Sequence, residues 1–307
     1  MTGKMYTKAI LAAIAVYSLW GFSFLASKVA QEHVTPFVLL AYRFDIAVIV
    51  LSAPLLLKKR SVRLKGKNIL PLLALGLAEP CIYFIGEQYG LRYSNSSFSG
   101  VMIALIPIVT LLMSAAFLKD RPSRSQWLFS ILSIIGVIVI TLSEKSEGDV
   151  TLIGVLFLTV AVISGSAYGV LSRKASDDFS VFERSYVMQL MGAVFYTALA
   201  LLENHADPGA MLRPLVQPDF VFAILYIALG ASVAGYALFN YAVSHAPMAN
   251  VVSFCNLTSV LSVLAGVIIL GEPFSLTSAA AMLAVLIGIW GVQKFGPETQ
   301  KNIEQGV

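Results

Sequence analysis

The chain has 307 residues, of which 58% are hydrophobic and 12% are charged, and its mean hydropathy is +0.82. This composition excludes an ordinary soluble domain and predicts an integral membrane protein. The net charge of +4 and the pI near 9.0 do not indicate nucleic-acid binding. The basic residues instead gather in short loops, above all at 58–67 (KKRSVRLKGK), as they do at the cytoplasmic ends of membrane helices.

Ten apolar segments are long enough to cross a bilayer as helices, which takes about 20 mostly apolar residues. In chain order they are 8–30, 36–57, 69–91, 96–118, 125–143, 151–172, 180–202, 218–240, 247–270 and 276–294. The first begins like a signal peptide, but its apolar stretch runs past the length of one, so we expect it to be retained. The sequence therefore predicts an all-α integral membrane protein with ten transmembrane helices.

Positive charge predicts the orientation, because Lys and Arg are retained on the cytoplasmic side. With a cytoplasmic N-terminus, 16 of the 21 basic residues fall inside, four fall outside, and Arg43 lies within a span. The inside set is Lys4, Lys8, Lys58, Lys59, Arg60, Arg63, Lys65, Lys67, Lys119, Arg121, Arg124, Arg173, Lys174, Arg184, Lys294 and Lys301. We therefore expect a multi-pass protein of the plasma (inner) membrane with both termini in the cytoplasm.

The two halves of the chain share one layout at an offset of 152 residues. Residues 105–123 align with 257–275, Asp120 meets Glu272, and the identical pairs are Leu105/Leu257, Leu112/Leu264, Leu118/Leu270, Ser123/Ser275 and Gly136/Gly288. Five spans is an odd number, so the second copy must enter the membrane upside down. The sequence predicts two inverted five-helix repeats, 1–146 and 147–307 with a short cytoplasmic tail, around a central cavity, as in secondary transporters.

Charged residues inside a span are costly and mark functional candidates. Arg43 and Asp45 lie in span two, and Glu79 and Glu87 lie in span three. Arg43 falls between the two glutamates in depth, so it can pair with either one, and a purely structural ion pair is the alternative. Glu79 lies near mid-membrane beside Pro80, where a carboxyl can exchange protons, and is the candidate proton-coupling group.

Uncharged polar and aromatic residues extend this candidate site. Tyr83 shares a helix face with Glu79, and Asn240 ends span eight where Gln88 ends span three. Span nine carries a polar stripe at Asn250, Ser253, Asn256, Ser259 and Ser262, which can bind substrate or hydrogen-bond neighbouring helices. Trp20, in mid-span, can line a cavity or pack in the core. The predicted substrate-binding set is Trp20, Arg43, Glu79, Tyr83, Glu87, Asn240 and Asn256.

The sequence lacks the motifs of several other function classes. It contains no GxxxxGK[ST], HExxH, CxxC or GxSxG motif, so we expect no enzymatic activity and no ATPase subunit. His33, His205 and His245 fall in separate loops, so we expect no metal and no cofactor. A TVGYG-type filter is also missing, which argues against an ion channel.

The sequence resembles the EamA-type members of the drug/metabolite transporter superfamily over about 8–294. The likeness is carried by 19–28 (LWGFSFLASK), 39–44 (LLAYRF), 89–91 (YGL), 104–120 (ALIPIVTLLMSAAFLKD) with its Pro107, and 256–273 (NLTSVLSVLAGVIILGEP). Asp120 stands where the family usually has Glu, and Ser259 stands where the first copy has Pro107. The resemblance implies a ten-helix inverted-repeat transporter that moves, and often exports, amino acids or other small metabolites.

We therefore expect a secondary transporter that exports amino acids or related compounds by alternating access. Arg43 would hold a carboxylate, Glu79 and Glu87 an amine or a proton, and Trp20 and Tyr83 an apolar moiety. The alternatives are an importer or facilitator of another small metabolite, and a non-transporting integral membrane protein. The expected partners are a small-molecule substrate and the lipid bilayer, with no nucleic acid, and the oligomeric state stays open.

Overall fold

The computed structural model describes residues 3–117, 123–146, 150–175, 178–246, 251, 254–272 and 274–295. Within these ranges all regular secondary structure is helical. The first half contains α1 (Gly3–Gln31), α2 (Pro36–Leu56), α3 (Leu70–Gly76), η1 (Leu77–Ile82), α4 (Tyr83–Arg92), α5 (Ser96–Ile103), α6 (Ile106–Phe117) and α7 (Arg124–Ser146). The second half contains α8 (Leu152–Ala175), α9 (Val181–Glu203), η2 (Pro208–Met211), η3 (Arg213–Val216), α10 (Pro218–Leu225), η4 (Tyr226–Ala234), α11 (Gly235–His245), α13 (Cys255–Ile269) and α14 (Leu276–Lys294).

Apolar helices occur at each of the ten predicted spans. Five are long and apolar enough to cross a membrane, namely Met5–Gln31, Pro36–Leu56, Leu70–Arg92, Val181–Glu203 and Pro218–Ala242. Five shorter ones lie at Ser96–Thr110, Arg124–Val139, Leu152–Tyr168, Leu257–Ile269 and Leu276–Val292. Large apolar side chains such as Leu56, Phe222 and Leu276 stand fully out from the bundle, as lipid-facing residues do. The described chain is therefore an all-helical, multi-pass fold.

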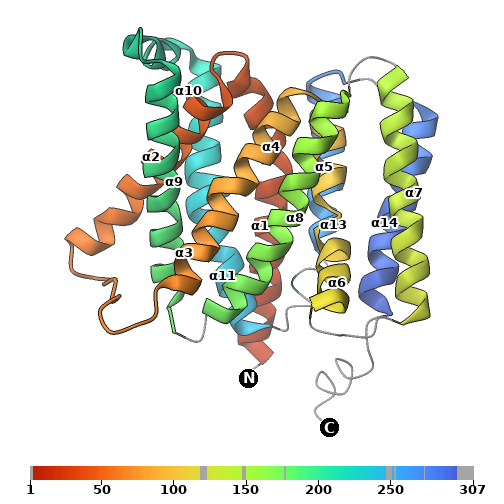
Figure 1. Ribbon diagram of the computed structural model, residues 1–307, viewed down its shortest axis with the longest axis horizontal. Helices are drawn as coiled ribbons and strands as arrows, with labels where there is room; N and C mark the ends of the chain where they lie inside the picture. Colours follow the sequence, from red (N-terminus) through yellow and green to blue (C-terminus); the bar gives the residue numbers. More distant parts are fainter. Residues whose placement is uncertain are drawn as a thin grey trace.

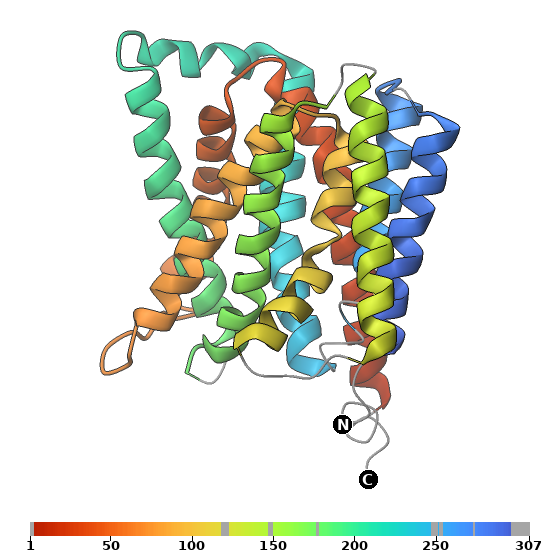
Figure 2. The same ribbon diagram turned by 45° about the vertical axis from the view of Figure 1, so that its right-hand side comes forward.

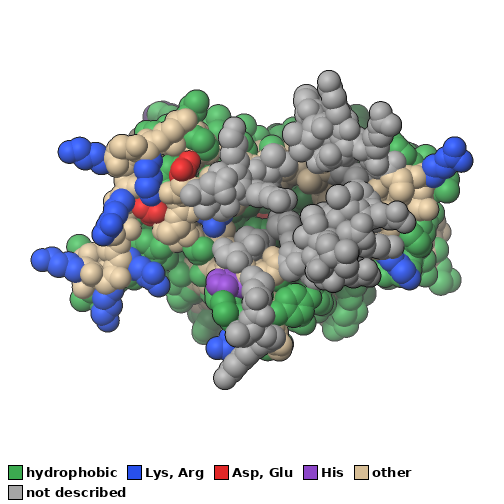
Figure 3. Space-filling view, turned by 90° about the horizontal axis from the view of Figure 1, so that it is seen from below, with side chains coloured by type: hydrophobic (Ala, Val, Ile, Leu, Met, Phe, Trp, Pro, Cys, Tyr) green, Lys and Arg blue, Asp and Glu red, His purple; other side chains and the backbone are tan. Residues whose placement is uncertain are grey.

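The helices stand side by side in one bundle (Figures 1 and 2). The start of α1 and the end of α14 lie at the same face, at the bottom of Figure 1. Seen from below, Lys and Arg side chains stand around the rim of this face (Figure 3). The exposed basic residues of the α2–α3 connection, at 58–60, 63 and 65, belong to this set. We call the face of the bundle that carries these residues the basic face.

Two helix pairs join the two halves of the chain. In each pair, the contacting residues are 152 positions apart, which is the offset between the two halves of the sequence. At one side of the bundle α7 packs against α14 (Figure 1), and Ser133 Oγ donates to the carbonyl of Val285, 152 residues away, at 3.1 Å. At the other side α2 packs against α9, and Thr197 donates to the Asp45 carboxylate, again 152 residues away, at 2.9 and 3.0 Å.

The α7–α14 contact is reciprocal because of its glycines. A Cβ on Gly136 would lie 2.8 Å from the carbonyl oxygen of Ala281, and one on Gly288 would lie 2.6 Å from that of Phe129. Phe129 and Ala281 are themselves 152 residues apart in the sequence. Each helix thus presents the equivalent surface to the other, and only glycine permits this close approach at both positions.

A third inter-half contact lies at the opposite face of the bundle, where α5 begins. The Glu272 carboxylate accepts hydrogen bonds from the backbone N–H of Ser96 at 2.7 Å and of Ser97 at 3.0 Å. The Ser97 hydroxyl also donates to it at 2.6 Å. A carboxylate at this position satisfies N–H groups that have no partner within the helix and complements the positive end of the helix dipole.

The described part of the span-nine polar stripe hydrogen-bonds a neighbouring helix. Ser259 Oγ donates to the carbonyl of Gly100 at 2.9 Å, and Ser262 Oγ donates to that of Ser96 at 2.6 Å. Both therefore tie α13 to α5. Asn250 and Ser253 lie outside the described residues.

The site is positioned by two helices that leave regular α-helical geometry in mid-span. Between α3 and α4, Glu79 has φ −143° and ψ 115° and precedes Pro80, which interrupts the helix over η1. Between α10 and α11, η4 is a run of π-helix over Tyr226–Ala234. Wide helical turns of this type are rare and often occur at functional sites. Arg43 on α2 and Tyr196 on α9 pack at these two irregular segments.

Candidate functional site

Arg43 is 2% exposed and is held by three kinds of contact. Its Nε donates to Ser232 Oγ of η4 at 2.7 Å. Its Nη1 lies 4.0 Å from Glu87 Oε2, the outer limit of an ion pair. Its guanidinium also stacks on the ring of Phe84, 4.1 Å from the centroid. Of the two glutamates open to Arg43 from the sequence, Glu87 is therefore the one within ion-pairing distance.

Glu87 is the centre of a hydrogen-bonded chain on α4 and α1. It accepts from the Tyr83 hydroxyl at 2.9 Å and from Gln88 Nε2 at 2.9 Å. The Gln88 side chain in turn bonds Ser27 at 3.3 Å and accepts from Gln31 at 2.9 Å. Glu87 and Tyr83 thus share one polar chain, which continues toward the face opposite the basic face.

Glu79 contacts the second half of the chain. Its carboxylate is 7% exposed and accepts a hydrogen bond from the Tyr236 hydroxyl of α11. The Tyr236 ring lies 5.6 Å from the Trp20 ring, and Trp20 Nε1 donates to the carbonyl of Ala231 at 3.0 Å. Trp20 thus covers the tyrosine that binds Glu79, and Glu79 also interacts electrostatically with Arg43.

The structure describes only one of the two asparagine side chains predicted for the site. Asn240 is buried in α11, and its amide donates to Ser185 Oγ of α9 at 2.9 Å, so it lies at the α9–α11 contact. Asn256 falls in α13, but its side chain is outside the part of the chain that the structure describes. Of the remaining five predicted residues, Arg43, Glu79, Tyr83 and Glu87 lie in one buried polar region, and the half-buried Trp20 packs at its edge against Tyr236.

Sequence reasoning missed the partners from the second half. Ser232 and Tyr236 carry no charge and lie in a long apolar segment, so nothing distinguishes them before the fold is known. Two more residues were missed on α9, Arg184 and Gln189, both of which are buried.

Arg184 lies near the face on which the sequence predicts it, but its side chain is 4% exposed rather than open to solvent. Ser180 and Glu183 form a capping box that begins α9 just before it, so Arg184 lies in the first turn and packs inward against α8. The S-x-x-E spacing at 180–183 is the sequence signature of this helix start, which agrees with the predicted span at 180–202.

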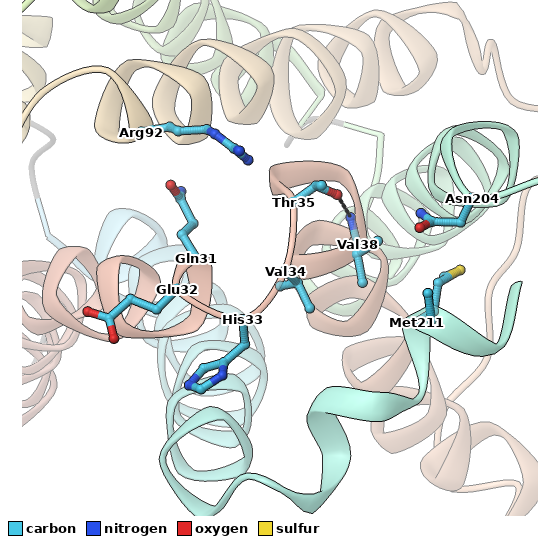
Figure 4. A pocket seen from close by; sticks show the side chains of 10 residues that line it. Gln31, Glu32, His33, Val34, Thr35, Val38, Arg92, Asn204 and Met211 are labelled. Carbon is cyan, nitrogen blue, oxygen red and sulfur yellow. Dashed lines mark hydrogen bonds between the residues drawn. The ribbon is translucent and has the colours of Figure 1, made fainter. Parts of the chain in front are cut away.

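A pocket of about 310 Å³ opens at the face opposite the basic face (Figure 4). It lies between the α1–α2 connection and the ends of α4 and α9, and Arg92 and Gln31 reach into it from two sides (Figure 4). Gln31 is also the residue that hydrogen-bonds Gln88. A continuous line of polar side chains therefore connects this pocket with Glu87.

The buried charges and the apolar helices together define a multi-pass membrane protein with a polar interior. A profile of the EamA-like transporter family matches this chain twice, over residues 7–142 and 152–293. The uncharacterized transporter YcxC of Bacillus subtilis (strain 168) is 31% identical over 294 residues, which cover 95% of this chain and 94% of that protein. An uncharacterized transporter of Archaeoglobus fulgidus is 26% identical, with 92% and 97% covered.

A crystal structure of another protein has the same fold, with a TM-score of 0.64 at 18% identity over 94% of this chain and 98% of that one. The chain belongs to the EamA-like transporter family and thereby to the drug/metabolite transporter superfamily, as its motifs predicted. Its relatives are described as transporters, which agrees with a small-molecule substrate bound within a membrane.

Proposed function

We propose that the protein is a secondary transporter of the plasma membrane that exports amino acids or related small metabolites by alternating access. The observation that carries this proposal is the buried charged network between the two halves of the chain. Arg43 bonds Ser232, and Glu79 bonds Tyr236. Charge buried in a membrane is costly, and it is commonly retained where it serves a substrate or ion path.

The proposed architecture has ten spans in two inverted repeats, 1–146 and 147–307, around a central cavity. Three observations support it. The same family profile matches each half, the α7–α14 and α2–α9 pairs meet through residues 152 apart, and the start of α1 and the end of α14 share the basic face (Figure 3). A basic face at which both ends lie supports cytoplasmic termini.

The proposed mechanism assigns each end of an amino acid to a group of opposite charge. Arg43 holds a carboxylate, and Glu87 with Tyr83 receives an amine. The 4.0 Å separation of Arg43 from Glu87 supports this, because a loose pair is readily exchanged for a pair with the substrate. Trp20 covers an apolar moiety, Asn240 and Asn256 extend the site, and Glu79 couples export to proton movement.

The proposal is tested with the purified protein in liposomes loaded with all twenty amino acids, and mass spectrometry measures what leaves. Export predicts release of a subset that exceeds the release from protein-free liposomes and responds to an imposed pH gradient. Release that ignores the gradient would indicate a facilitator, and uptake without release would indicate an importer. A double variant, Arg43→Ala with Glu79→Ala, provides the inactive control. Release of no amino acid would overturn the substrate class.

A further inference from the structure

Arg184 is a second buried arginine, and it differs from Arg43 in its surroundings. It lies in the first turn of α9, near the basic face (Figure 1), and is 4% exposed. Arg43 has Glu87 within ion-pairing distance. Within the described part of the chain, by contrast, no carboxylate forms an ion pair with Arg184. A buried guanidinium without a counter-charge is strongly disfavoured, so its retention requires an explanation.

The contacts of Arg184 leave part of its guanidinium unused. Nη1 donates to the Ser172 carbonyl at 3.1 Å and to the Ser172 hydroxyl at 3.0 Å. Nε is buried and has no hydrogen-bond partner. An arginine binds a carboxylate through two parallel N–H groups, so an edge with an unused N–H is the geometry that an incoming carboxylate fits.

A second unsatisfied side chain lies on the same helix. Gln189 is fully buried, and neither its amide nitrogen nor its amide oxygen has a partner. It follows Arg184 by five residues, about 7.5 Å along the helix axis and about 140° around it, so the two side chains leave α9 on different sides. Between them Ser185 bonds Asn240 of α11. Buried amides are usually hydrogen-bonded, so Gln189 is a separate polar position on α9 that can take a partner.

This region connects to the central network. Tyr168, one turn before Ser172 on α8, interacts electrostatically with both Arg184 and Glu79. Its ring lies 6.4 Å from that of Tyr236, the residue that bonds Glu79. Arg184 therefore stands at the end of a line of polar residues that runs from the basic face to Glu79.

We propose that Arg184, with Ser172, forms a second anion-binding subsite near the basic face, separate from Arg43, which takes the carboxylate of the transported molecule on its way to or from the central network. Arg184 supplies the positive charge and the planar donor edge. The subsite rests on the proposed function, because the anion is the substrate that the protein moves. It restricts that substrate to molecules with a free carboxylate.

If Arg184 has a purely structural role, replacing it should change the stability of the protein in the opposite direction. Ser172 lies near the end of α8, and an arginine that donates to a terminal carbonyl stabilises the helix end. If Arg184 serves only as this cap, replacing it lowers stability. If its charge is reserved for a ligand, replacing it with a neutral side chain of similar reach stabilises the empty protein, as is common at binding sites.

The first experiment measures the melting temperature of the purified, substrate-free protein in detergent. We expect Arg184→Gln to raise it by at least about 2 °C, and Arg43→Gln, which removes a partnered charge, to lower it. Arg124→Gln, at an exposed basic residue of α7, is the matched control and should change nothing. A lower melting temperature for Arg184→Gln would overturn the subsite in favour of the helix cap.

The second experiment measures binding through the shift in melting temperature caused by the twenty amino acids and by their carboxamides. The amino acids that stabilise the wild type should bind Arg184→Gln with an apparent affinity about 30-fold lower or weaker still. Their carboxamides should show a similar loss of apparent affinity for the wild type. Arg184→Lys should recover part of the loss, because it keeps the charge without the fork. The subsite would be overturned if the amino acids stabilise Arg184→Gln as much as the wild type. It would also be overturned if no amino acid stabilises the wild type.

The outcomes separate this inference from the proposed function. If liposomes release no amino acid but acids still stabilise the protein through Arg184, the subsite stands and the export proposal fails. If amino acids are released at the same rate by Arg184→Gln and by the wild type, export stands and the subsite is wrong.

Discussion

Arg43 shows how a buried charge depends on partners from distant parts of the chain. Arg43→Ala strands Glu87 and leaves the Ser232 hydroxyl without its donor. Removing one partner of a buried ion pair costs about 3–5 kcal/mol, so we expect both the melting temperature and transport to fall sharply. Arg43→Lys should also be impaired, because it keeps the charge but loses the planar fork. Thermal melts and liposome flux measure the two effects, and full transport by Arg43→Ala would remove Arg43 from the site.

Glu79 is the residue to test for proton coupling. Glu79→Gln keeps the shape and can still accept from Tyr236, but it cannot carry a proton. In vesicles it should lose accumulation driven by a pH gradient while it retains exchange of substrate across the membrane. Tyr236→Phe is the matched control, because it removes the hydrogen bond and leaves the carboxyl in place. If Glu79→Gln still concentrates substrate in response to the gradient, another group couples the proton.

At the residue scale, charge was the signal that sequence could use. Arg43, Glu79 and Glu87 stand out because they interrupt apolar segments, and the structure brings them within electrostatic reach of one another. Ser232 and Tyr236 complete the network but are ordinary residues of an apolar helix, so only the fold identifies them. The burial of Arg184 had no signal in the sequence beyond its place in the first turn of span seven.

At the scale of elements, helix positions followed directly from hydropathy, while their irregularities did not. The ten apolar segments each contain helix, although the predicted span 96–118 is divided between α5 and α6, and part of the predicted span 247–270 lies outside the described residues. Pro80 is the sequence signal for the break at η1, because proline removes a backbone donor and clashes with the preceding turn. The π-helical η4 has no proline within it and no other mark in the sequence. It packs against α1 and α2.

The cap on α5 gives a prediction at the same scale. Glu272→Ala removes a charged acceptor from two backbone donors and one hydroxyl at a helix start. Loss of such a cap typically costs about 1 kcal/mol, so we expect the melting temperature to fall by about 2–4 °C. Asp178→Ala, at an exposed carboxylate, is the control. An unchanged melting temperature for Glu272→Ala would show that water replaces the carboxylate without loss.

At the scale of the whole molecule, the orientation in the membrane is the open question with the most direct test. In a background with Cys81→Ser and Cys255→Ser, single cysteines at positions 65, 147 and 294 report their side of the membrane. Lys65→Cys and Lys294→Cys should be shielded from an impermeant thiol reagent in intact cells, and Glu147→Cys should react. Reaction at position 65 would reverse the orientation, and different results at 65 and 294 would rule out an even number of spans.

The reciprocal seam between α7 and α14 has a consequence for how the chain must be joined. Each helix offers the other the same surface, with Gly136 against Ala281 and Gly288 against Phe129, so recognition is built into the halves themselves. We therefore expect the two halves to associate without a covalent link. Fragments 1–146 and 147–307, produced from separate genes in one cell, should associate and restore transport. Fragments that end before α7 should not.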